Sequence, residues 1–154
     1  MITAGDCLLL MKKVLVLNGP NLNLLGMREK EVYGSNTLAN IARLLIKESF
    51  KRGLLLCSFQ SNSEDEMIRK IQHSVIEGID FILINPASFT HTSIGIRDSL
   101  VGTAIPFLEV HLSNINSREK FRSNSVLSDV AIGSIIGLGW KSYLGAIFYV
   151  VEAC

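Results

Sequence analysis

The chain has 154 residues, which is enough for one domain with a substantial apolar core. Its formal charge is +1, so the basic surface that nucleic-acid binding requires is not indicated, and no apolar run approaches the roughly 20 residues of a membrane-spanning helix. The apolar content of 48% and the mean hydropathy of +0.35 are high for a lone monomer, which favours apolar surface buried between subunits.

The N-terminal segment is expected to lie outside the fold. The run CLLLM is too short for a signal-peptide core, and no basic residue precedes it. Met11, followed by two lysines and an apolar strand, is typical of a natural start. We therefore divide the chain into an N-terminal extension (1–11) and a single domain (12–154).

The cysteines indicate a reducing compartment. There are three of them, an odd number, and they are widely spaced rather than arranged as metal ligands: Cys7, Cys57 and Cys154. Such a set favours free thiols over a disulfide framework, so we expect a cytoplasmic protein.

The first half of the chain alternates apolar runs with helical patterns. Residues 13–18 (KVLVLN) predict a buried strand, and the apolar spacing of residues 38–45 predicts a helix that Gly53 ends. Residues 54–60 predict a second strand. The sequence SEDE at residues 63–66 is a capping box. It begins a helix whose expected apolar face is Met67, Ile68, Ile71 and Val75.

The second half continues the alternation. Strands are predicted at residues 81–85, 106–111 and 130–137, with a helix over 93–102. A last helix is expected to place its apolar residues on one face: Tyr143, Leu144, Ile147, Phe148 and Val151. Continuously apolar strands separated by helices predict an α/β fold, a flavodoxin-like, doubly wound five-stranded parallel sheet with helices on both faces.

Polar side chains gather after three of these strands, where open parallel sheets bind their ligands. The loop after the first strand, residues 18–34, is far longer than the usual 2–6 residues. These loops bring amides, arginines, a tyrosine and two histidines to one edge of the sheet, which favours a site there. The candidates are Asn18, Asn21, Asn23, Arg28, Tyr33, Asn85, Ser88, Thr90, His91, Glu109, His111, Ser113, Asn114, Arg118 and Arg122.

Missing motifs narrow the chemistry. No GxGxxG or GxxxxGK motif follows the first strand, so no phosphate-binding loop is indicated. The histidines lack HExxH spacing, no GxSxG elbow occurs, and no cysteine lies beside a plausible base. The remaining set of Tyr, His, Arg and Asn suits proton abstraction next to a carbonyl, followed by loss of a hydroxyl.

The long first loop offers a base for that chemistry. The pKa of a free tyrosine is about 10, so only ~0.1% is phenolate at pH 7. A neighbouring cation that lowered the pKa to about 8 would raise the phenolate fraction to roughly 10%. Arg28 lies five residues before Tyr33 and is the candidate cation. Asparagines would hold the developing enolate oxygen, and His111 would protonate the leaving hydroxyl.

These residues resemble those of a known family, the type II 3-dehydroquinate dehydratases. The similar segments cover residues 13–150 in the family's order: LNGPNLNLLGMRE, VYG, SNSE, ILINPASFTHTSIGIRD, PFLEVHLSNINSREKFR and GLGWKSYLGA. The resemblance implies a flavodoxin-like subunit in a homododecamer of trimers. It also implies elimination of water from 3-dehydroquinate in the shikimate pathway, with no cofactor and no metal.

The resemblance assigns catalytic roles motif by motif. Tyr33, in VYG, would remove the proton beside the ketone, and His111, in EVHLSN, would be the general acid. Arg28 would lower the pKa of the tyrosine, Asn21 would hold a water on the enolate oxygen, and Glu109 would orient nearby groups.

It also assigns the substrate contacts. Asp98, in IRD, would reach a neighbouring subunit's site. The other contacts to the substrate's hydroxyls and carboxylate would come from Asn85, His91, Leu112, Ser113 and Arg122. One departure from the family pattern is Lys30, which stands where many members have proline and leaves the catalytic residues in place.

Plainer interpretations remain open at this point. Glu109 is also interpretable as half of a structural ion pair, and His91 and Asp98 as packing residues between subunits. Asn18 is expected to cap turns in the NGPN loop, and His73 to lie on the surface of a helix. Two other functions are a flavin- or nucleotide-binding module without chemistry and an inactive assembly protein. The missing phosphate loop argues against the first, and the presence of Arg28, Tyr33 and His111 against the second.

Overall fold

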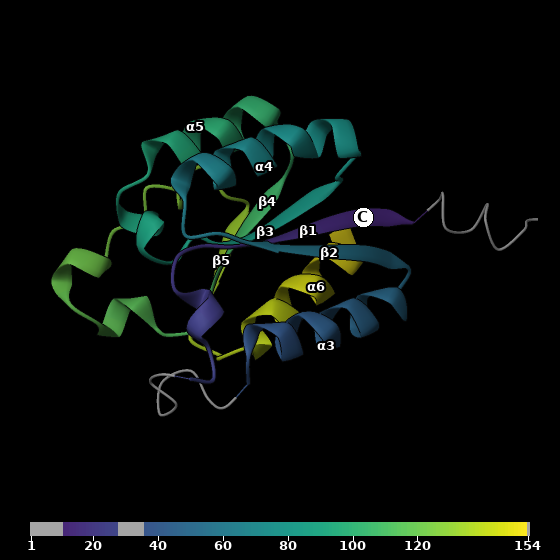
Figure 1. Cartoon of the computed structure of the whole chain (residues 1–154), viewed down its shortest axis with the longest axis horizontal. Coiled ribbons are helices and arrows are strands. Elements are labelled where there is room, and N and C mark those ends of the chain that lie inside the picture. Colours follow the sequence, from purple (N-terminus) through teal and green to yellow (C-terminus); the bar gives the residue numbers. More distant parts are fainter. Residues whose placement is uncertain (1–10, 28–35, 154) are drawn as a thin grey trace, which may run out of the picture.

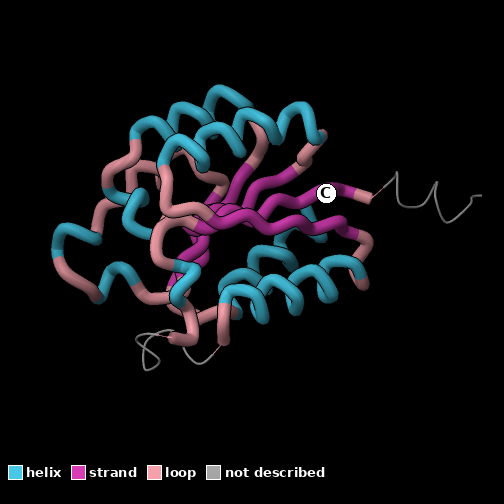
Figure 2. The backbone as a smooth tube through the Cα atoms, in the orientation of Figure 1, coloured by secondary structure: helices cyan, strands magenta, loops and turns pink. Residues whose placement is uncertain are grey.

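The computed structural model describes residues 11–27 and 36–153. Within them, five parallel strands form one sheet in the order β2-β1-β3-β4-β5 (Figures 1 and 2). The strands are β1 (Lys12–Asn18), β2 (Leu54–Gln60), β3 (Phe81–Asn85), β4 (Phe107–His111) and β5 (Gly133–Ile136). The α-helices are α3 (Leu38–Phe50), α4 (Glu64–Glu77), α5 (Ile94–Thr103) and α6 (Lys141–Ala153). The parallel α/β architecture expected from the sequence is confirmed.

The helices cover both faces of the sheet. Figure 1 shows α4 and α5 on one face and α3 and α6 on the other. Because successive strand side chains point to opposite faces, Val14 and Val16 join the core under α3 and α6, while Leu15 and Leu17 join the core under α4 and α5. This two-sided burial explains why the inner strands β1, β3 and β4 are continuously apolar in sequence, whereas the edge strands β2 and β5 are only partly buried. Among the described residues, no helix is both long and apolar enough to cross a membrane.

The start of α4 differs in detail from the predicted capping box. The Ser63 hydroxyl accepts from the Glu66 backbone N–H at 3.4 Å, as expected. The Glu66 carboxylate, however, accepts from the Ser61 hydroxyl rather than from the backbone of Ser63. The Ser63 N–H donates instead to Ser61 Oγ at 2.9 Å, so the Ser61 hydroxyl bridges the Ser63 backbone and the Glu66 carboxylate.

Two predicted helix faces are partly wrong. Val75 on α4 is 56% exposed and Phe148 on α6 is 52% exposed. The buried faces are completed by small residues, Ser74 in α4 and Ala146 in α6, which let the helices lie close to the sheet. The predicted fifth strand is also shorter at its start, because the backbone of residues 127–131 forms a turn.

The loops after β1 and β3 touch each other. The Gly19 N–H donates to Asn85 O at 2.8 Å. A Cβ atom at Gly19 would lie 2.3 Å from Pro86 O, so only glycine permits this approach. The order β2-β1-β3 reverses the direction of winding at this pair of strands, which is where doubly wound sheets bind their ligands. Residues 1–10 of the expected extension (1–11) lie outside the described residues, and the domain boundary stays a prediction.

Candidate active site

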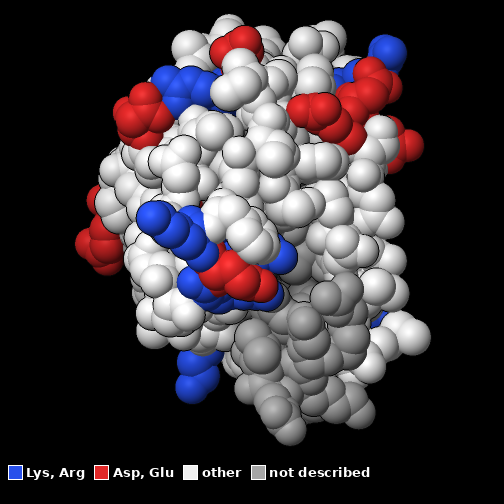
Figure 3. Space-filling model, turned by 90° about the vertical axis from the view of Figure 1, so that its left-hand side faces the viewer, with Lys and Arg blue, Asp and Glu red and all other residues white. Residues whose placement is uncertain are grey.

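A pocket opens at the carboxyl ends of β1, β3 and β4. Figure 3 views this side of the molecule, where basic and acidic side chains gather near the centre. The wall includes the helical turns η1 (Leu22–Leu24), η2 (Ala87–His91) and η3 (Ile115–Ser117), with η4 (Lys120–Arg122) at one side. Of the eleven residues with an assigned catalytic or substrate-binding role, seven line the pocket: Asn21, Asn85, His91, His111, Leu112, Ser113 and Arg122. The candidates Ser88 and Arg118, which have no assigned role, line it as well.

The other four predicted residues do not line it. Arg28 and Tyr33 lie outside the described residues. Glu109 lies behind His111 in β4, buried and 1% exposed. Asp98 is exposed on α5 and is absent from the pocket wall of its own chain, as its predicted role in a neighbouring site requires.

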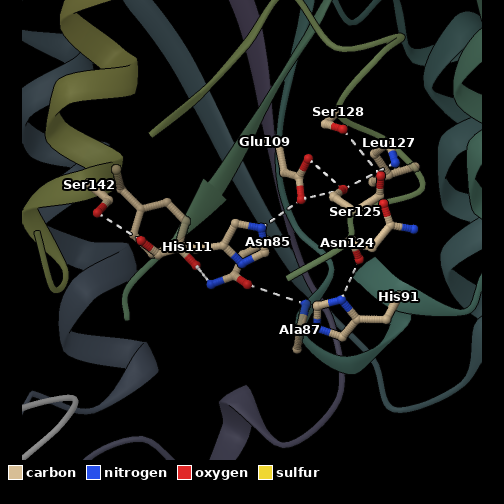
Figure 4. A network of polar contacts seen from close by, with 11 residues as sticks. Asn85, Ala87, His91, Glu109, His111, Asn124, Ser125, Leu127, Ser128 and Ser142 are labelled. Atoms are coloured by element: carbon tan, nitrogen blue, oxygen red, sulfur yellow. Dashed lines mark hydrogen bonds and ion pairs between the residues drawn. The ribbon is translucent and has the colours of Figure 1, made fainter. Parts of the chain in front are cut away.

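Strand β4 supplies a buried acid–base pair. Glu109 Oε1 and His111 Nε2 are 2.6 Å apart, and His111 is only 4% exposed. Two residues apart on one strand, the side chains share a face of the sheet. The Ser125 hydroxyl donates to the carboxylate at 2.8 Å from each oxygen (Figure 4). An ionised carboxylate can only accept hydrogen bonds, so in its contact with Glu109 the Nε2 atom of His111 is the donor and carries a proton. The Nδ1 atom of His111 is then the one left for the pocket.

The ends of β1 and β3 are joined by a buried polar triad. The Tyr143 hydroxyl donates to Asn18 Oδ1 at 2.5 Å and accepts from Asn85 Nδ2 at 3.1 Å. Asn18 is 1% exposed and also donates towards Ser58 and Phe59, so its predicted role as a turn cap is wrong. Burial raises the pKa of Tyr143 above its ordinary value, which keeps the hydroxyl neutral.

Two pocket residues have backbone conformations that side chains rarely adopt. Asn21 has φ 65° and Ala87 has φ 53°, both in the left-handed region. The Asn21 N–H donates to Asn62 Oδ1 at 3.0 Å, and the Ala87 N–H donates to Asn85 Oδ1 at 3.3 Å. These bonds hold the loops after β1 and β3 in place at the pocket edge. Conformations of this kind concentrate at functional sites.

His91 is held by the segment after η4. Its Nδ1 lies 2.7 Å from Asn124 O, and because a carbonyl only accepts, Nδ1 carries the proton. The second nitrogen, Nε2, is then an acceptor when the ring is neutral. This tautomer suits a contact with a substrate hydroxyl.

Two arginines lie at the side of the pocket. Arg122 Nε is 3.0 Å from Glu119 Oε2, and Arg118 Nε is 3.5 Å from the same oxygen. The pKa of Glu119 lies below its ordinary value because of a hydrogen bond from its own backbone and the charges of Arg122 and Arg118. Both arginines line the pocket, where their positive charges favour an anion such as a carboxylate. The family resemblance assigns a substrate contact to Arg122, whereas Arg118 is a candidate without an assigned role.

Two residues of the site region were missed by sequence reasoning. Ser125 lies in a polar run without periodicity, and Tyr143 fits an ordinary amphipathic helix. Each acts through a partner far away in the chain, so no local pattern identifies it. Across residues 11–27 and 36–153, no group of three or more His, Cys, Asp or Glu side chains is arranged to hold a metal ion.

Residues 12–151 match the protein family described as "Dehydroquinase class II". The 3-dehydroquinate dehydratase of Psychromonas ingrahamii is 60% identical over 131 residues, 85% of this chain and 87% of that one. The enzyme of Ralstonia pickettii with the same name is 52% identical over 142 residues, 92% of each chain.

Solved structures agree with these relatives. The type II dehydroquinase of Butyrivibrio crossotus has a TM-score of 0.88 at 40% identity, over 92% of this chain and 98% of that one. The type II dehydroquinase of Propionibacterium acnes has a TM-score of 0.87 at 41% identity, over 92% and 97%. The chain therefore belongs to the type II 3-dehydroquinate dehydratases, a family of hydro-lyases.

Proposed function

We propose that residues 12–154 form a 3-dehydroquinate dehydratase domain. It would convert 3-dehydroquinate to 3-dehydroshikimate in the shikimate pathway by anti elimination of water, through an enolate and without a cofactor. The observation that carries this proposal is the buried Glu109–His111 pair at the pocket, with Nε2 of His111 engaged and Nδ1 left for the reaction. The pocket contacts support the acid half of the mechanism, and the family resemblance supports the base half.

In the base half, Tyr33 as phenolate takes the proton from the carbon beside the ketone. The electron pair of the broken C–H bond passes into the enolate. Arg28 stabilises the phenolate, and Asn21 holds a water that donates to the enolate oxygen. Asn21 lines the pocket, which supports its part, whereas Arg28 and Tyr33 lie outside the described residues.

In the acid half, the imidazolium of His111 donates its Nδ1 proton to the leaving hydroxyl. The C–O bond breaks, water departs, and the enolate electrons re-form the carbonyl while the new C=C bond appears. Glu109 accepts from Nε2–H throughout, which fixes the orientation of the ring. One proton is gained by Tyr33 and one is lost by His111, so the protein returns to its starting state by a single proton exchange.

Substrate orientation follows from the pocket wall. Arg122 would bind the substrate carboxylate, while the amide of Asn85, Nε2 of His91 and the backbone of Leu112 and Ser113 would bind its hydroxyls. Asp98 would act in the site of a neighbouring subunit, which makes assembly part of the function. We propose the homododecamer of trimers on the family resemblance.

The activity is tested by following conjugated-enone absorbance when purified protein is mixed with 3-dehydroquinate. Turnover should resist EDTA and borohydride, which would stop metal-dependent and Schiff-base routes. His111→Ala and Tyr33→Phe should each lower turnover by about 100- to 10,000-fold. The matched control is His73→Ala, because the His73 side chain is 59% exposed on α4 and does not line the pocket.

Either of two outcomes would contradict the proposal. An intact, assembled protein without turnover would favour the inactive assembly protein instead. Full activity in His111→Ala would remove the general acid from the mechanism.

A further inference from the structure

The three successive residues 124–126 contact two separate parts of the site, the η2 turn and strand β4. Asn124 O accepts from His91 Nδ1 at 2.7 Å, and the Val126 N–H donates to Thr90 O at 2.9 Å. Between them, Ser125 turns towards β4 and reaches Glu109 (Figure 4). The segment therefore joins the η2 turn, which carries a predicted substrate contact, to the buried acid–base pair.

The hydrogen bonds of Ser125 determine the orientation of its hydroxyl group. Ser125 Oγ accepts from the Leu127 N–H at 3.1 Å, and its single proton points at the carboxylate of Glu109, 2.8 Å from both oxygens. Glu109 is 1% exposed. In the part of the chain that the structure describes, His111 and Ser125 supply the side-chain hydrogen bonds to this carboxylate. A buried carboxylate that loses one of two donors is strongly destabilised in its position.

We propose that Ser125 is a positioning residue for the dehydration. It fixes the carboxylate of Glu109, and through it the ring of His111, so that Nδ1–H faces the leaving hydroxyl. Partners of this kind, which lie behind the reacting group, determine orientation and tautomer. Displacement of a catalytic group by about 1 Å can cost roughly 100-fold in rate. The inference rests on the proposed dehydratase function.

The geometry separates catalysis from binding at this position. The contacts of residues 124–126 to His91 and Thr90 use backbone atoms, which a side-chain substitution at Ser125 leaves in place. Arg97 also holds the segment through Val126 O at 2.6 Å. Loss of the Ser125 hydroxyl should therefore reach the acid through Glu109 and leave the substrate contacts intact.

The first test compares steady-state kinetics of assembled variants. Ser125→Ala should lower kcat by about 10- to 100-fold, the effect of a hydrogen bond to a charged group, with KM within about threefold of wild type. Ser125→Thr keeps the hydroxyl and should restore most of kcat. The matched control is Ser128→Ala, because Ser128 is exposed in the same turn and its hydroxyl donates to Ser125 O at 3.2 Å. A wild-type kcat in Ser125→Ala, or a change confined to KM, would overturn the proposal.

The second test is a double-mutant cycle with Glu109→Gln. If Ser125 acts through Glu109, Ser125→Ala should lower kcat much less in the Glu109→Gln background than in wild type. Losses that simply multiply would show that Ser125 acts by another route. If Ser125→Ala does not fold, Ser125→Cys takes its place, since a thiol is a weak donor and should give a kcat well below that of Ser125→Thr.

The two proposals fail in different ways. A wild-type protein without dehydratase turnover would end the proposed function before any variant is compared. An active wild type whose Ser125→Ala variant is equally active would end only the positioning role.

Discussion

At the scale of single residues, the buried triad of Tyr143, Asn18 and Asn85 holds one wall residue of the pocket, Asn85, in place. The Tyr143 hydroxyl uses its donor on Asn18 and accepts from Asn85, and all three side chains are buried. Asn85 also accepts from the Ala87 N–H, which fixes which end of its amide faces the loop. The triad therefore sets the orientation of an amide that is predicted to bind substrate.

Tyr143→Phe should remove that support without removing the ring. Asn18 Oδ1 and Asn85 Nδ2 would each lose a buried partner, so we expect a loss of about 1–3 kcal/mol in the free energy of unfolding. KM should rise several-fold because the Asn85 amide gains freedom. Denaturant unfolding at one fixed protein concentration, together with steady-state kinetics, measures both effects.

The control for this substitution is Tyr149→Phe. Tyr149 lies on the same helix, is 41% exposed, and should tolerate loss of its hydroxyl. Equal stability of the two variants would show that the triad contributes little.

The sequence predicted residues whose role is local and missed those whose role depends on distant partners. Glu109 and His111 share a face of one strand, so their pairing follows from strand geometry. The Tyr143–Asn18 bond spans 125 positions of sequence. Nothing near Tyr143 in helix α6 distinguishes it from an ordinary core residue, because the asparagine that gives it a polar role lies at the end of β1.

At the scale of elements, regular periodicity was readable and short irregular turns were not. The inner strands β1, β3 and β4 were predicted because burial on both faces leaves an unbroken apolar run. The turns η3 and η4 are three residues each, too short to produce a period. The segment that follows them carries Ser125, and its path is fixed by long-range hydrogen bonds to η2, β4 and α5.

The link between this segment and α5 should depend on pH. Arg97 forms a two-pronged pair with Asp129, with Nη2 2.8 Å from Oδ2. A hydrogen bond from Arg97 lowers the pKa of Asp129 below its ordinary value of 3.8. A carboxyl whose pKa is lowered by folding contributes stability above the unfolded value, and that contribution is lost as the pH falls below it.

Asp129→Asn should therefore lower the thermal midpoint by about 1–3 °C at pH 7, and the difference from wild type should shrink as the pH falls below the ordinary carboxyl value of 3.8. Thermal scans of both proteins between pH 3 and pH 7 measure it. Because the pair is exposed, 1 M NaCl should also shrink the difference. If the difference in thermal midpoint stays constant across this pH range, the ion pair is not its cause.

At the scale of the whole molecule, α5 presents a surface that fits the proposed assembly. Ile94 and Val101 are 54% and 55% exposed, and Asp98 is exposed between them. Spacings of four and three residues place these side chains on one side of the helix. An apolar surface that carries a carboxylate suits contact with another subunit, and it accords with the high mean hydropathy of +0.35.

Subunit complementation would test whether Asp98 acts in a neighbour's site. Asp98→Ala and His111→Ala should each be nearly inactive alone. Co-expressed and purified as mixed oligomers through two affinity tags, they should recover activity, since a site can combine its own intact His111 with the neighbour's intact Asp98. Random mixing puts about a quarter of all sites in that state, so turnover per subunit should approach a quarter of wild type. The control is an equal mixture of Tyr33→Phe with His111→Ala. Each site takes its tyrosine and its histidine from the same subunit, so every site in this mixture lacks one of the two. Mixed oligomers no more active than their parents would place the function of Asp98 within its own chain.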